Sequence, residues 1–243
     1  SPLRPAVQAS PPSQAGQEMK AEIERHWRKG GKHALVMGDS VAEEFGDYLR
    51  DDLGIKVLFG KQKMRASAPE DHALQVSDSF REIRDDVDVK NAGVILYLGG
   101  KNCQGDIAAE MWAQGKGPLS ALDKVKPEHF PEGLVVLVFP PVKMNDSPEF
   151  RAVRKVNDDL LTKHLPRATN PQRFKVVSGH FHSESDTMLI PDDFVTSLHL
   201  NESGNRKLAR ALINELSAAP AEAEAAPAEE EARIEAKLEP LSK

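Results

Sequence analysis

A serine and a histidine that are far apart in the sequence each stand in a setting suited to chemistry. Ser40 follows Gly38 and Asp39 directly after an apolar segment, and His199 stands in the tetrapeptide LHLN before the last helical pattern. Acyl transfer by serine requires an alcohol, a base within hydrogen-bond reach and N–H donors directed at the oxyanion. Ser40 would supply the alcohol and His199 the base.

Two further residues could supply oxyanion donors. Gly60 closes the second apolar segment, and its missing Cβ lets the backbone N–H approach a substrate closely. Asn102 carries a side-chain amide in GGKN, after the third apolar segment. With the backbone N–H of Ser40, these groups would form an oxyanion hole. The alternative interpretations are a helix cap for Ser40 and a turn residue for Asn102.

Apolar segments that alternate with helical patterns would position these residues. Near-continuous apolar strands separated by helices are typical of a parallel sheet covered on both faces. Right-handed crossovers place the strand-to-helix loops at one edge, where open α/β sheets bind ligands. The sequence therefore predicts a three-layer α/β/α sandwich with a five-stranded parallel sheet. Strands are predicted over 33–37, 55–59, 92–98, 133–139 and 174–177.

The chain divides into four parts. Residues 1–16 are predicted to be a disordered linker, 17–30 an N-terminal helix, 31–217 the folded domain and 218–243 an acidic tail rich in Ala, Glu and Pro. The apolar spacing within the domain is typical of helices. Helical segments are predicted over 41–53, 72–87, 107–112, 120–125, 150–165 and 201–216.

The blocks VMGDSV, the lone glycine at 60, YLGGKN and SLHLNESGNRKLARAL resemble, in order and spacing, the four blocks of the SGNH (GDSL-type) hydrolases. The resemblance implies a flavodoxin-like fold and serine esterase chemistry on small acyl groups, without metal or cofactor. By position it implies Ser40 as nucleophile, Gly60 and Asn102 as oxyanion donors and His199 as base. VVLVFPPV and FRAVRKVNDDLL resemble, more specifically, the esterase-like domains encoded in some LINE-type retrotransposons.

Two positions depart from the family pattern. Thr196 stands where the family has an aspartate three residues before the histidine, and Cys103 where an aspartate usually follows the asparagine. The first departure affects mechanism, because in serine proteases loss of the carboxylate that orients the imidazole lowers turnover about 10⁴-fold. Asp192 or Asp193 could take its place through a loop. Alternatively, a backbone carbonyl could orient the ring and leave a Ser–His dyad.

The composition argues against several other classes of protein. The net charge of −6 provides no electrostatic footprint for direct nucleic-acid binding by the domain. A single cysteine excludes an intrachain disulfide and favours an intracellular, reducing compartment. No apolar run is long enough to span a bilayer. His180, His182 and Asp186 lack a further ligand at a defined spacing, and no glycine-rich phosphate motif occurs, so neither a metal nor a cofactor is expected.

Two hypotheses stay open at this point. The first is a serine esterase acting on a small acyl-ester substrate. The second is a catalytically inactive SGNH-fold binding or scaffold module, with Thr196 marking the loss of the triad. A retrotransposon-encoded protein that serves in a nucleoprotein particle is one setting in which such a module could act. A protein partner would bind through the N-terminal helix or the acidic tail. The chain begins with Ser1 rather than methionine, which is compatible with an excised fragment.

Overall fold

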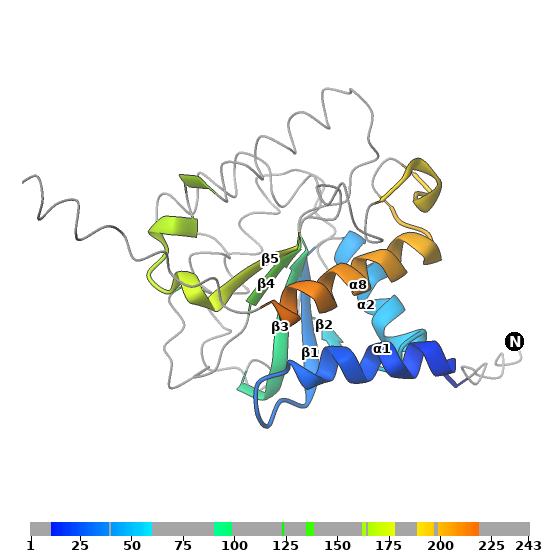
Figure 1. Ribbon diagram of the computed structural model, residues 1–243, viewed down its shortest axis with the longest axis horizontal. Helices are drawn as coiled ribbons and strands as arrows, with labels where there is room; N and C mark the ends of the chain where they lie inside the picture. Colours follow the sequence, from blue (N-terminus) through cyan, green and yellow to red (C-terminus); the bar gives the residue numbers. More distant parts are fainter. Residues whose placement is uncertain are drawn as a thin grey trace, which may run out of the picture.

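The sheet that carries the candidate site is parallel. The computed structural model describes residues 11–38, 40–59, 90–98, 123, 135–138, 162–163, 165–177, 189–196 and 199–218 (Figure 1). Within them the strands are β1 (His33–Gly38), β2 (Val57–Phe59), β3 (Ala92–Leu98), β4 (Val135–Val138) and β5 (Phe174–Val177). They pair in the order β2-β1-β3-β4-β5. The predicted α/β fold with a parallel sheet is confirmed.

The carboxyl ends of the strands gather at one edge of the sheet. Gly38 at the end of β1 lies beside Leu98 at the end of β3, and Phe59 at the end of β2 lies beside Val36. The order 2-1-3-4-5 is that of flavodoxin-like sheets, which bind ligands where the order reverses between β1 and β3. The chain that follows Gly38 therefore leaves the sheet at the edge and the position where such folds bind ligands.

Both faces of β1 and β3 are buried. Val36 and Leu96 face the described helices and belong to one core cluster with them. Leu35 and Tyr97, on the opposite face, are 3% and 1% exposed. Burial on both faces explains why these strands read as continuous apolar runs rather than as alternating patterns.

Helix α2 (Ser40–Asp51) follows β1 and packs back on the sheet. Val41, Phe45 and Leu49 recur at helical spacing and are buried, which gives the helix one apolar face. The chain leaves α2 through Gly54, whose φ of +71° is a conformation that glycine adopts without strain. The helix therefore runs from the carboxyl edge of the sheet, where its first residue lies, toward the opposite edge.

Helix α8 (Glu202–Ser217) closes the described part of the fold. The side chain of Asn201 caps it by accepting a hydrogen bond from the N–H of Gly204 at 3.0 Å. Leu208 and Leu212 are buried, and the helix contacts α1, α2 and β5. Its amino end thus lies close to α2, which positions the residues just before it.

Helix α1 (Gln14–Arg25) lies side by side with α8 (Figure 1). It begins inside the segment predicted to be a linker, because the Ser13 hydroxyl caps it. Met19 and Ile23 belong to the same core cluster as the sheet, and Arg210 of α8 pairs with a glutamate of α1 at 3.0 Å. The apolar face of α1 is therefore used within the chain, and a partner protein would have to bind its exposed face.

Several predicted features lie outside the described residues. They include Gly60, Asn102, Cys103 and the acidic tail beyond residue 218. The predicted helices over 72–87 and 107–112, and all but a few residues of those over 120–125 and 150–165, also lie outside them. None of the helices in the described ranges is long and apolar enough to cross a membrane.

Candidate active site

Ser40 is the first residue of α2 and lies at the carboxyl edge of the sheet. A single residue separates it from the end of β1, and it is exposed. The first backbone N–H groups of a helix have no intrahelical partners and favour negative charge. An acyl group attacked by an alcohol at this position would therefore develop its oxyanion beside N–H groups that have no partner in the helix.

A tight turn before α8 presents His199. Phe194 and Leu200 form an antiparallel bridge across the base of this turn. The backbone N–H of His199 donates to the Thr196 hydroxyl at 3.2 Å, and its carbonyl accepts from the N–H of Val195 at 2.8 Å. Thr196, which stands where the SGNH pattern has an aspartate, therefore holds the backbone of the histidine rather than its ring.

The ring of His199 contacts α2. Its Nδ1 lies 2.8 Å from Oε1 of Glu44. Glu44 comes one helical turn after Ser40, so the two side chains share a face of the helix. Ser40 and His199, both within the described residues, form no direct hydrogen bond, and such bonds are often long before substrate binds. With Nδ1 engaged, Nε2 is the ring atom that would accept a proton.

The second carboxylate oxygen of Glu44 has an unusual environment. Oε2 is shielded from solvent and has no hydrogen-bond partner among the residues that the structure describes, although 43% of the side chain is exposed. A desolvated carboxylate oxygen without a donor is unfavourable, and a nearby positive charge offsets that cost. Among the described residues, the imidazole of His199, which Glu44 contacts through Oε1, can provide such a charge when it is protonated.

Asp193, one of the two aspartates predicted to complete a triad, has three other partners. Its carboxylate accepts hydrogen bonds from the N–H of Ile190 at 2.8 Å, the Ser203 hydroxyl at 2.8 Å and the Lys207 ammonium at 2.7 Å. Burial opposes the charge of Asp193, but the three donors outweigh burial and lower the pKa of this carboxyl. This carboxylate joins the turn to the first two turns of α8.

Of the predicted site residues, the structure brings the histidine to the helix that begins with the serine. Asp192 is exposed, and Nδ1 of His199 pairs with Glu44 rather than with either aspartate. Gly60 and Asn102 lie outside the described residues, so their roles stay predictions. The sequence reasoning missed Glu44. Its signal was the four-residue spacing in SVAEE, which places a carboxylate on the serine's face of a helix.

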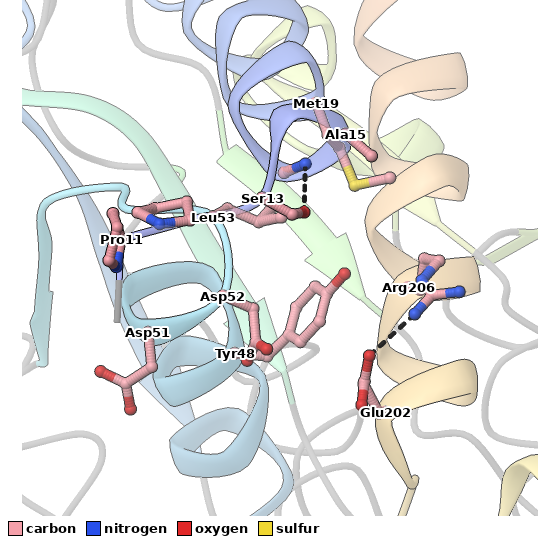
Figure 2. A pocket seen from close by; sticks show the side chains of 12 residues that line it. Pro11, Ser13, Ala15, Met19, Tyr48, Asp51, Asp52, Leu53, Glu202 and Arg206 are labelled. Atoms are coloured by element: carbon pink, nitrogen blue, oxygen red, sulfur yellow. Dashed lines mark hydrogen bonds and ion pairs between the residues drawn. The ribbon is translucent and has the colours of Figure 1, made fainter. Parts of the chain in front are cut away.

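A cavity of about 660 Å³ lies near the end of α2 that is remote from Ser40 (Figure 2). The start of α1, the end of α2 and the start of α8 form its walls. The Tyr48 ring points into this space, where Arg206 pairs with Glu202 at 2.8 Å. Burial raises the pKa of the Tyr48 hydroxyl, and Arg206 opposes that effect. Neither Ser40 nor His199 lines the cavity, so it is separate from the candidate active site.

Metal ligation has no support among the described residues. No group of three histidine, cysteine or acidic side chains there could hold an ion. His180, His182 and Asp186 lie outside those residues. The expected absence of a metal therefore stays a prediction.

Solved structures similar to this chain include lipolytic and carbohydrate esterases. A GDSL-like lipase from Bacteroides thetaiotaomicron is 11% identical, with a TM-score of 0.49 over 83% of this chain and 96% of that one. A lipolytic G-D-S-L family protein from Veillonella parvula is 17% identical, with a TM-score of 0.44 over 75% and 96%. A carbohydrate esterase family 3 protein from Talaromyces cellulolyticus is 13% identical, with a TM-score of 0.47 over 76% and 96%. No family model and no curated protein matches the sequence, so the chemistry has to be inferred from this chain's own residues.

Proposed function

We propose that this chain is a serine hydrolase that cleaves esters of short acyl groups, with Ser40 as nucleophile and His199 as base. The observation that carries the proposal is the 2.8 Å contact between Nδ1 of His199 and Glu44. It brings an imidazole from near the end of the domain to a residue one turn after Ser40 in the helix that Ser40 begins. An exposed alcohol, a helix amino end and a carboxylate-bound imidazole are the components of nucleophilic acyl transfer.

The proposed reaction needs only the ester and water. The Ser40 oxygen attacks the acyl carbon while its proton moves to Nε2 of His199. The ester C–O bond breaks, and the same proton passes to the departing alkoxide. Water then attacks the acyl-enzyme and gives a proton to His199. The bond between the Ser40 oxygen and the acyl carbon breaks, the proton returns to Ser40, and the acid is released.

Three donors are proposed to stabilise the oxyanion: the N–H groups of Ser40 and Gly60 and the side-chain amide of Asn102. Their support is positional, because they follow β1, β2 and β3 in the sequence, and these strands end at one edge. Donors fixed before reaction are each worth about 10²- to 10³-fold in kcat.

The proposal includes the three-layer, flavodoxin-like sandwich of the SGNH hydrolases. The strand order and the burial of both faces of β1 and β3 support it. The narrower resemblance to LINE-encoded esterase domains adds no residue role, and it stays a prediction from sequence.

Turnover of p-nitrophenyl acetate by the wild-type chain, Ser40→Ala and His199→Ala tests the proposal. Each substitution should lower kcat/KM by about 10³-fold or more, to the background rate. Ser217→Ala and His26→Ala are matched controls, because these residues form another serine–histidine contact, at 3.0 Å, at the far ends of α8 and α1. Both controls should retain the wild-type rate. Wild-type turnover no faster than that of Ser40→Ala would contradict the proposal and favour the inactive binding module.

A further inference from the structure

We infer that Glu44 is the positioning carboxylate of this site and replaces the aspartate that the SGNH pattern has at position 196. Its catalytic consequence rests on the proposed function. In this arrangement the acid comes from the helix of the nucleophile, one turn after Ser40, rather than from the loop of the histidine.

The spacing along α2 suits this role. Residues four apart on a helix have Cβ atoms about 5–6 Å from each other, so a ring anchored at one can face the other. Glu44 reaches Nδ1 of His199 at 2.8 Å. Nε2 lies on the other side of the ring, where it can serve the alcohol of Ser40 one turn earlier in the helix.

The other groups able to orient the ring have different partners. The Thr196 hydroxyl accepts the backbone N–H of His199. The Asp193 carboxylate accepts from three donors, among them Lys207 at 2.7 Å. Within the described residues, Glu44 is therefore the carboxylate that contacts the imidazole.

The electrostatics of Glu44 favour the same role. Its Oε2 is buried and has no donor within the described part of the chain, so the site gains when positive charge appears on the adjacent ring. Such charge appears when His199 takes the proton of Ser40. Before that step, the carboxylate at Nδ1 favours the tautomer that carries its proton there and leaves Nε2 to accept.

Glu44→Gln keeps the size of the side chain and removes its charge. It should lower kcat for p-nitrophenyl acetate by about 10²- to 10⁴-fold with little change in KM. Glu44→Asp should also lower kcat, because the carboxylate is withdrawn by one methylene. Glu43→Gln, the same exchange at the neighbouring residue, should retain the wild-type value. Wild-type kcat in Glu44→Gln, with Ser40→Ala inactive, would overturn this inference and leave the proposed function intact.

The tautomer of His199 gives a second readout that does not depend on turnover. Long-range ¹H–¹⁵N correlation spectra of histidine-labelled full chain should show the proton on Nδ1 in the wild type and in Glu43→Gln. Glu44→Gln should show a mixture or the other tautomer, because an amide can donate to Nδ1 as well as accept. Identical His199 signals in the wild type and Glu44→Gln would overturn the inference even if the chain hydrolysed no ester.

Discussion

Glu44, which contacts the ring of His199, and Asp193, which lies just before the turn of His199, are two carboxylates whose surroundings differ. Asp193 is 2% exposed and accepts hydrogen bonds from three donors. The side chain of Glu44 is 43% exposed; one oxygen contacts the imidazole of His199, and the other has no partner among the described residues. The Asp193 carboxylate therefore accepts from donors of the turn and of α8, whereas the Glu44 carboxylate contacts the titratable ring of His199.

The difference indicates that the carboxylate of Asp193 stabilises the fold, whereas the carboxylate of Glu44 orients the imidazole of His199. Asp193 joins η4 (Pro191–Asp193) to α8 through Ser203 and Lys207, so it fixes the start of the turn to the helix. Ion pairs as exposed as that of Glu44 contribute between zero and about 1 kcal/mol to stability. Substitution should therefore cost stability at position 193 and turnover at position 44.

The largest effect on stability is expected for Asp193→Asn. It removes the charge of a buried carboxylate that accepts three hydrogen bonds, one of them from Lys207, so the free energy of unfolding should fall by about 2–4 kcal/mol. Glu44→Gln should change it by less than about 0.5 kcal/mol. Urea unfolding followed by circular dichroism measures both values, with the exposed Asp192→Asn as a control near wild type. Equal losses at positions 44 and 193 would break the comparison.

Acid unfolding should also depend on the carboxylate of Asp193. Because its three donors lower the pKa of Asp193 in the folded protein, the unfolded chain binds more protons in the acid range. The stabilisation is fully present above the unfolded pKa of about 3.9 and is lost as the pH falls through the lower folded value. Between pH 6 and pH 2.5 the wild type should therefore lose more stability in urea titrations than Asp193→Asn. Equal losses of stability in the wild type and in Asp193→Asn would show that other groups cause the acid sensitivity.

A smaller effect is expected for Asn201→Ala. The substitution removes the cap of α8 and should cost about 1 kcal/mol of unfolding free energy. The Asn201 side chain also donates to the Asp192 carbonyl at 2.6 Å, so its loss loosens the turn of His199, and kcat should fall as well. Asn214→Ala, at an exposed position of the same helix, is the control for both readouts. Unchanged kcat in Asn201→Ala would show that the turn does not need this residue to position the ring.

The smallest effect is expected at the cavity end of α2. Burial raises the pKa of Asp52, and Glu202 and Asp51 add to the effect, so the folded protein disfavours its charge. Asp52→Asn should raise the unfolding free energy at pH 7 by at most a few tenths of a kcal/mol after solvent screening. Asp51→Asn should instead be neutral or slightly destabilising, because a hydrogen bond from Arg50 lowers the pKa of Asp51. Thermal melts of the wild type and the two variants measure these differences. An Asp52→Asn variant that melts below the wild type would contradict the predicted gain in stability.

The strands and the flanking helices could be predicted because local patterns determine them. The apolar, β-branched run over 92–98 coincides with β3 (Ala92–Leu98), and α8 begins at the cap that Asn201 provides. The partner of His199 could not be predicted in this way. It lies 155 positions away in the sequence, and the pairing depends on how a turn places one ring against one helix face. The block pattern directed attention to the histidine's own loop, whereas the carboxylate that contacts the ring comes from α2, the helix that begins with Ser40.

Fluorophosphonate labelling followed by peptide mass spectrometry tests the central claim most directly, because it reports the reacting oxygen itself. We expect a covalent adduct on Ser40 of the wild-type chain, formed much more slowly in His199→Ala and Glu44→Gln and at the wild-type rate in His26→Ala. No adduct on Ser40, or labelling that His199→Ala does not slow, would contradict the account.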